Sequence, residues 1–152
     1  MKRTLLLAAL AAVVLTGCVT RTMTLPPNFI NVDKDAMGIY AVRAVAPDGA
    51  MVSLRTEKNP QNGTLDFWTQ AVTNQLTQGR GYKVVKSEEV TSDAGLPGRL
   101  LTFSTERKGV TFTYLVALFL QGQEILIAEA GGKSEAMDPR AAELCKSLLT
   151  AK

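Results

Sequence analysis

The chain has 152 residues, of which 46% are hydrophobic and 20% are charged, and this suits a folded domain with a sizeable core. It contains no histidine, which excludes Ser–His and Cys–His nucleophile pairs and imidazole ligands for a metal. The net charge of +3 falls to +1 without Lys2 and Arg3, and the remaining charges are interspersed, so the charge gives no evidence for nucleic-acid binding and no nucleic-acid partner is expected.

The N-terminal segment has the three parts of a secretory signal peptide. The basic pair Lys2-Arg3 precedes an uncharged apolar run from Leu5 to Leu15, and small residues follow at the expected cleavage site. The run is shorter than the roughly 20 residues that a helix needs to cross a bilayer. We therefore predict a signal peptide over residues 1–17, with a buried core helix or a short transmembrane anchor as the alternative.

The end of this segment, Leu15-Thr16-Gly17-Cys18, resembles the lipobox of bacterial lipoproteins. The resemblance implies cleavage between Gly17 and Cys18, diacylglycerol on the sulfur of Cys18, and an acyl chain such as palmitate on its new amino group. Several acyl chains on one residue hold a protein durably on a membrane, here a membrane of the bacterial cell envelope. In a Gram-negative host, Val19-Thr20 in place of an Asp after the cysteine implies the outer membrane, with the domain facing the periplasm.

Residues 18–35 show neither helical nor strand periodicity, and Pro26-Pro27 exclude a helix there. We predict that they are the lipidated cysteine and a tether, whose root-mean-square reach would be about 20–25 Å. The apolar residues Leu25, Phe29 and Ile30 leave open the alternative that the later half of this segment docks on the domain.

Residues 36–152 are predicted to form a single globular domain that begins with a β-hairpin and a helix. Two β-rich runs, 39–45 and 51–56, flank the turn sequence Pro47-Asp48-Gly49. Thr64 can cap a helix over 64–79, and two glycines are expected to end it. The apolar positions of this helix recur every three or four residues, and the two glycines follow them: Leu65, Trp68, Val72 and Leu76, then Gly79 and Gly81.

Four further strands are expected, over residues 82–91, 99–105, 110–120 and 124–130, followed by a helix over 134–152. Because the run from Tyr114 to Leu120 is apolar on both faces, its strand should be central and covered on both sides. The element order is β-β-α-β-β-β-β-α. It predicts the α+β class, with an antiparallel sheet of about six strands and packing helices.

These features resemble a known fold. They are the hairpin, the helix with Trp68, the strand opened by Gly81-Tyr82, the turn Gly95-Leu96-Pro97-Gly98, the meander through Tyr114 and Gly122, and the closing helix with Cys145-Lys146-Ser147-Leu148. Together they look like the PsbP/DcrB-like fold, an α/β/α sandwich found in photosystem extrinsic proteins, a nuclear-import cofactor, type VI secretion effector chaperones and bacterial lipoproteins. The resemblance implies a binding or assembly module without catalysis, and it assigns no site residues.

Few residues are candidates for chemistry. Glu88 and Glu89 are strand neighbours that point to opposite faces, so they suit a solvated edge strand better than an acid–base pair. Cys145 lies on the apolar stripe of the closing helix and is predicted to be a buried core residue. The pair Gly131-Gly132 lacks the context of a phosphate loop, so we interpret it as a turn or a helix end.

Two functions remain open. The first is a non-enzymatic protein-binding or assembly lipoprotein that holds an envelope partner at an exposed sheet edge or beside helix 64–79. Phe67 and Trp68 form a candidate binding surface on that helix, with core packing of Trp68 as the alternative. The second is a small-ligand (anion) binder or an enzyme whose site uses Arg43, Arg55, Arg99 and carboxylates, and convergence of these arginines in one concave pocket would favour it. No metal or other cofactor is expected.

Overall fold

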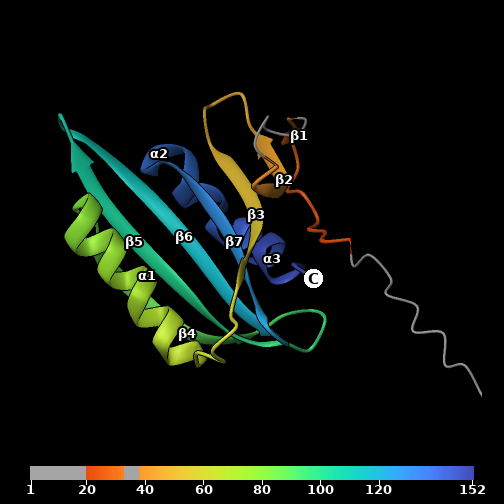
Figure 1. Cartoon of the computed structure of the whole chain (residues 1–152). Coiled ribbons are helices and arrows are strands. Elements are labelled where there is room, and N and C mark those ends of the chain that lie inside the picture. The colour runs from red at the N-terminus through yellow and green to blue at the C-terminus, as the bar shows by residue number, and fades with distance from the viewer. Residues whose placement is uncertain (1–19, 33–37) are drawn as a thin grey trace, which may run out of the picture.

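The computed structural model describes residues 20–32 and 38–152 and places an antiparallel sheet at the centre of the molecule (Figure 1). The sheet has seven strands in the order β1-β2-β3-β7-β6-β5-β4. The strands are β1 (Ile30–Asn31), β2 (Tyr40–Val45), β3 (Met51–Lys58), β4 (Lys83–Thr91), β5 (Pro97–Arg107), β6 (Val110–Gln121) and β7 (Glu124–Lys133). The signal peptide and the lipobox, with Gly17 and Cys18, lie outside the described residues.

Helices cover both faces of this sheet. One face carries α1 (Leu65–Arg80), which lies along β4, β5 and β6 (Figure 1). The other face carries α2 (Ser134–Met137), the 3-10 helix η1 (Asp138–Arg140) and α3 (Ala141–Leu149). The predicted α+β class is therefore confirmed, with a seventh strand, β1, beyond the six expected. None of the helices in the described part of the chain is long and apolar enough to cross a membrane.

The ends of α1 follow from local signals. The Thr64 hydroxyl accepts a hydrogen bond from the Phe67 backbone N–H at 3.1 Å, as an N-cap should. At the other end Gly81 adopts a left-handed conformation with φ 69°, and its N–H bonds to the Leu76 carbonyl. The predicted start and end of this helix are confirmed, and Gly79 lies inside its last turn.

The closing helix is not continuous, and the prediction of one helix over 134–152 was wrong. It is divided into α2, η1 and α3 by Pro139, which lies in η1. Proline has no backbone N–H and its ring clashes with the carbonyl four residues earlier, so an uninterrupted helix cannot pass through this position.

The core consists of two buried layers, one on each side of β6 and β7. The run Leu115–Phe119 on β6 is at most 3% exposed, which confirms that this strand is central and covered on both sides. Alternate residues face α1 and the α2–α3 layer, because successive side chains of a strand point to opposite faces. Leu118 accordingly belongs to the cluster under α1, and Phe119 to the cluster under α3.

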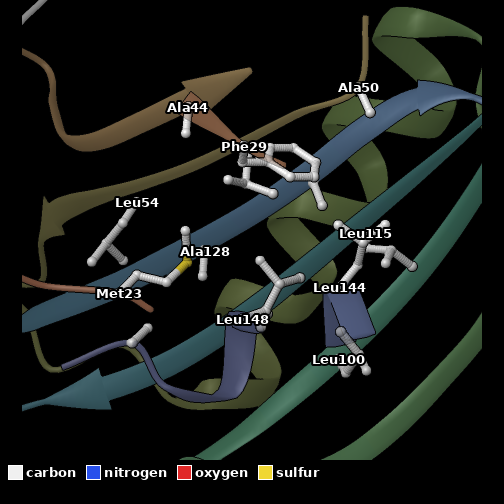
Figure 2. Packing of buried hydrophobic residues seen from close by; sticks show 14 of the residues in the cluster. Met23, Phe29, Ala44, Ala50, Leu54, Leu100, Leu115, Ala128, Leu144 and Leu148 are labelled. Carbon is white, nitrogen blue, oxygen red and sulfur yellow. The ribbon is translucent and has the colours of Figure 1, made fainter. Parts of the chain in front are cut away.

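Residues 20–32 pack on the domain. The prediction of a free tether was therefore wrong for this part of residues 18–35. Met23 and Phe29 are each 8% exposed and lie among the core residues of the α3 side (Figure 2). The backbone of Thr22 exchanges two hydrogen bonds with that of Lys152, at 2.9 and 3.1 Å. The docking alternative holds for Leu25 and Phe29, whereas the side chain of Ile30 is 69% exposed and its backbone pairs with β2.

Candidate functional site

The α1 side of the sheet is covered only in part by its helix. Because α1 lies on β4, β5 and β6, the same face of β2, β3 and β7 continues beyond the helix as a polar surface. Arg43 on β2 is opposite Ser53 on β3, which is opposite Glu129 on β7. Residues directly opposite in an antiparallel sheet share a face, so these three side chains stand in one row beside α1.

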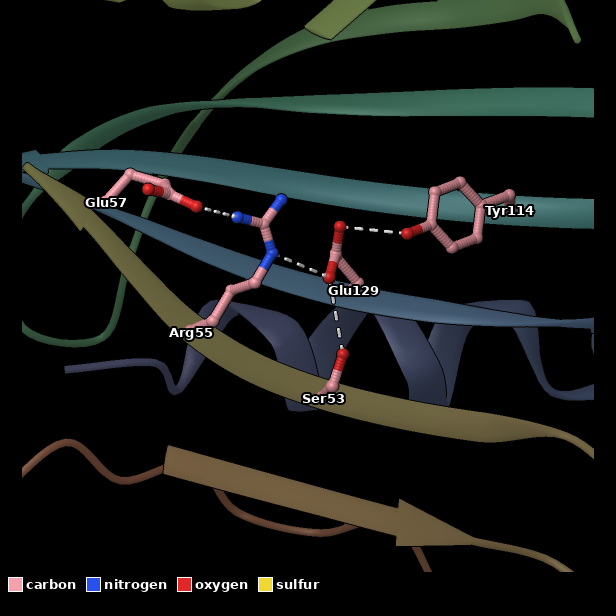
Figure 3. Close-up of polar contacts among 5 residues, drawn as sticks. All are labelled: Ser53, Arg55, Glu57, Tyr114 and Glu129. Carbon is pink, nitrogen blue, oxygen red and sulfur yellow. Dashed lines mark hydrogen bonds and ion pairs between the residues drawn. The ribbon is translucent and has the colours of Figure 1, made fainter. Parts of the chain in front are cut away.

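Glu129 is the centre of a hydrogen-bonded cluster on this surface (Figure 3). Its Oε1 accepts a hydrogen bond from Tyr114 Oη at 2.8 Å, and its Oε2 lies 3.4 Å from both Ser53 Oγ and Arg55 Nε. Arg55 Nη1 also pairs with Glu57 Oε1 at 2.5 Å. The side chains of Glu129 and Arg55 are only 13% and 20% exposed, so we expect this Glu129 network to be more rigid than a surface ion pair.

The network holds Tyr114 in its neutral form. Burial raises the pKa of the Tyr114 phenol far above its ordinary value, and the negative charge of Glu129 and the hydrogen bond to it raise it further. Since even the ordinary phenol pKa of 10.0 lies above physiological pH, Tyr114 is protonated there, and its raised pKa keeps it a hydrogen-bond donor into alkaline solution. The pair therefore suits hydrogen bonding better than proton transfer.

The ring of Tyr114 lies over Gly131, its cross-strand neighbour on β7. A Cβ atom at Gly131 would lie 2.7 Å from Tyr114 Cδ2, closer than two carbon atoms can approach, so only glycine leaves room for the ring. Gly131 and Gly132 thus lie within a strand, and their interpretation as a turn or helix end was wrong. A glycine within a strand often marks such a close approach. The sequence contained this signal in the pair Gly131-Gly132.

A hollow of about 220 Å³ opens beside the network, between the C-terminal half of α1 and the sheet. All three tyrosines of the chain line it, together with Ser53, Glu129, Met51, Leu76, Arg80 and Gly131. We call it the Glu129 hollow. Its lining combines aromatic rings with a charged, hydrogen-bonded carboxylate, a composition that binding sites commonly show.

A larger hollow, of about 690 Å³, lies at the C-terminal end of α1, and two of its lining side chains are bonded to backbone carbonyls there. Thr105 Oγ1 donates to the Gly81 carbonyl at 3.1 Å, and Arg107 Nη2 donates to the Arg80 carbonyl at 3.3 Å. These bonds satisfy carbonyls at and just beyond the end of α1. We therefore assign this hollow a structural role.

The three arginines proposed for an anion site do not converge. Arg55, Ile127, Leu118 and Arg99 are consecutive cross-strand partners, so Arg55 and Arg99 are three strand spacings apart, about 14–15 Å. Arg99 pairs instead with Asp66 at 3.2 Å and Glu89 at 3.4 Å, near the start of α1. Arg43 lies over the Tyr40 ring at 5.9 Å, and its Nε has no hydrogen-bond partner among the described residues.

Phe67 and Trp68 divide their roles. Trp68 packs against the core cluster under α1, while Phe67 is 61% exposed and meets the Trp68 ring edge-on at 5.8 Å. Phe67 therefore presents an apolar side chain to solvent on the helix where a binding surface was expected. Whether it binds a partner stays a prediction.

The two carboxylates of β4 lie on opposite faces of an edge strand. Glu89 is opposite Arg99 on the α1 side and pairs with it, whereas Glu88 is opposite Leu100 and pairs with Lys86 at 2.8 Å. They form no acid–base pair. Within residues 20–32 and 38–152, no group of three or more potential metal ligands is close enough to hold an ion.

Cys145 is only half-buried, where full burial was expected. It packs at the border of the α3-side cluster, and burial, followed by the charge of Glu88, raises the pKa of its thiol. The helix places Leu144 and Leu148 in the core at 0% exposure, and leaves Cys145 at the edge of the same stripe.

No protein-family model and no curated protein matches this chain. Several solved structures do resemble it. Cyanobacterial PsbP from Synechocystis sp. PCC 6803 has a TM-score of 0.65 and 14% identity over 88% of this chain and 86% of that one. LpqN of Mycobacterium tuberculosis, described as involved in cell envelope biogenesis, has a TM-score of 0.59 and 12% identity over 84% and 79%. A variant of the protein Mog1 has a TM-score of 0.57 and 13% identity over 86% and 82%. At these identities the likeness confirms the PsbP-like fold.

Proposed function

We propose that this chain is a lipid-anchored protein of the bacterial cell envelope that binds a partner protein, without catalysis, at the Glu129 hollow. The Glu129 network carries this proposal, because its charged groups pair with one another and its phenol keeps its proton. Groups held in place in this way bind with a smaller loss of conformational entropy. Tyrosines, which line this hollow, are enriched at protein interfaces.

The enzymatic and anion-binding alternatives have less support. General acid–base catalysis needs a group that exchanges its proton near the operating pH, and the ordinary phenol pKa of 10.0 lies above neutral pH, so the raised pKa moves Tyr114 still further from that range. Of the arginines proposed for an anion site, Arg55 is paired with Glu57 and Glu129, and Arg99 is paired with Asp66 and Glu89, so neither offers uncompensated positive charge. We therefore place a polar or hydrogen-bonding side chain of the partner in the hollow.

The membrane part of the proposal rests on the lipobox resemblance, in which Cys18 carries the lipid. The fold shared with LpqN, whose description places it in cell envelope biogenesis, agrees with an envelope role for this chain. In a Gram-negative host, the residues after Cys18 favour the outer membrane, with the domain in the periplasm. Phe67, exposed on α1, is a second contact that a partner could use.

Site-specific photo-crosslinking in cells tests the binding site. A photoreactive residue in place of Tyr40, which lines the hollow, should give one discrete adduct, and the same residue at exposed Gln61 should give none. Glu129→Gln keeps the size of the side chain, removes its charge and should abolish the Tyr40 adduct. The matched control is Glu106→Gln, which changes an exposed carboxylate outside the hollow. This variant should still form the adduct from position 40. Adducts that persist in Glu129→Gln, or that form only from Gln61, would overturn the proposed site.

A further inference from the structure

The point at which the chain joins the domain is fixed at Arg21. The Arg21 guanidinium donates to Gln121 and forms an ion pair with Glu124, which flank the turn between β6 and β7. The next residue, Thr22, is bonded on both backbone groups to Lys152. Thr24 follows in the same manner, since its N–H bonds to Thr150 Oγ1 at 2.8 Å and its carbonyl accepts from Ser147 Oγ at 2.5 Å. These contacts tie the chain to α3 from its first described residues.

A lipid on Cys18 would therefore have a very short reach. Only Val19 and Thr20 separate Cys18 from Arg21, so the two Cα atoms are three residue steps apart, and a fully extended chain covers at most about 10–11 Å over that length. A free tether over residues 18–35 would have given about twice this distance. The polar zone of a bilayer leaflet is itself about 5–8 Å thick, so the attachment point must lie next to the headgroups.

The attachment point lies at one end of the sheet. That end contains the β6–β7 turn, to which Arg21 is bound, and the β4–β5 loop, where the Asp93 N–H bonds to the Leu149 carbonyl at 2.8 Å. The turn between β5 and β6, with Lys108, lies at the opposite end. Since β6 has 12 residues, the two ends are about 40 Å apart.

A mostly apolar hollow of about 280 Å³ adjoins the attachment point. Its lining includes Leu25, Pro26 and Pro27 from the docked segment, and Lys146 and Thr150 from α3 and the residue after it. We call these five residues the anchor face. Nearby charges balance, because Lys146 and Lys152 are matched by Glu143 and Asp93 at the same hollow and its neighbour. Contact of this face with lipid therefore depends on the short chain between Cys18 and Arg21 and on the apolar surface, and it does not require anionic headgroups.

We propose that the anchor face lies against the lipid headgroups, which orients the domain on the membrane; this rests on the proposed lipid at Cys18. The Glu129 hollow then lies at a distance from the bilayer. Tyr114 lies seven residues along β6 from Gln121, which places the network about 24 Å from the membrane-proximal end. A partner can reach the hollow without displacing lipid.

Collisional quenching by a quencher attached to lipid tests this orientation. The full chain, purified from membranes in its processed form and in a Cys145→Ala background, is labelled with a fluorophore at Lys146→Cys or, as control, at Lys108→Cys. Both lysines are exposed, and they lie at opposite ends of the molecule. In phosphatidylcholine vesicles, quenching should be several-fold stronger at position 146. A Gly/Ser insertion of about 15 residues between Val19 and Thr20 restores a reach of about 20 Å and should remove most of that difference.

The outcomes separate the orientation from the lipid. If the measured mass of the purified chain showed that it carries no acyl groups, both the proposed lipid and the orientation would be overturned. A lipidated chain that is quenched equally at both positions, or more strongly at position 108, would overturn the orientation alone. Quenching at position 146 that appears only when phosphatidylglycerol is added would contradict the claim that reach and apolar contact suffice.

Discussion

Tyr114 lies directly over Gly131, close enough that any side chain at position 131 would displace its ring. The same ring carries the hydroxyl that bonds to Glu129 at 2.8 Å, so a backbone feature of β7 positions the central hydrogen bond of the network. The site is therefore sensitive to a residue that has no functional group of its own.

Gly131→Ala should destabilise the protein by about 1–3 kcal/mol, because the added methyl group forces the Tyr114 ring out of its place. Urea denaturation measures this change in the free energy of unfolding. Gly79→Ala is the matched control: it has open space around its Cβ position inside α1, and should stabilise by about 0.5–1 kcal/mol. A neutral effect of Gly131→Ala would show that the ring has room to move.

The Tyr114 phenol should make stability fall in alkaline solution. Its pKa in the folded chain is raised above the ordinary value of 10.0, so the unfolded chain loses the proton first as the pH rises. Stability from this group is complete below pH 10.0 and is lost above it, by up to about 1.4 kcal/mol per pH unit. Tyr114→Phe removes the ionisable group, and its free energy of unfolding should decline less steeply above pH 10.0 than that of the wild type. Equal slopes would contradict the raised pKa.

Cys145 should behave as a partly shielded structural thiol. Burial raises the pKa of its thiol, so alkylation should be slower in the folded chain than in the same chain unfolded by urea. Cys145→Ala removes a small volume at the border of the core and should cost about 1 kcal/mol or less. Labelling at the same rate in the folded and unfolded chains would place the thiol on the open surface.

Cys18→Ser should leave an unprocessed precursor and abolish incorporation of a fatty-acid probe, because serine has no sulfur to receive diacylglycerol. Mass and probe labelling of the chain expressed in a bacterial host measure both effects. Since Cys145 is the other cysteine of the chain, Cys145→Ala serves as the control and should be processed and labelled normally. Labelled protein of mature size from Cys18→Ser would refute the lipobox assignment.

The sequence by itself determined the elements whose signals are local. Thr64 and Gly81 delimit α1 because a cap needs only groups within one helical turn. The uninterrupted apolar run of β6 determined its central place, since burial on both faces leaves no position for a polar side chain. The signal for the break at Pro139 was also local, because the proline is visible in the sequence. The helical periodicity of the residues around Pro139 led to the prediction of one continuous helix.

Only the tertiary structure decided which distant residues meet. Thr22 reaches Lys152 across almost the whole chain, and Glu129 meets Ser53 and Tyr114 from different strands. Such contacts depend on strand order and register, which place Arg55 beside Glu129 and keep Arg99 three strands away. Register is set by the packing of whole faces, because a shift of one residue turns every side chain of a strand to the other side. No single segment contains that information, which is why the docked N-terminal segment and the Glu129 network emerge only when the sheet is assembled.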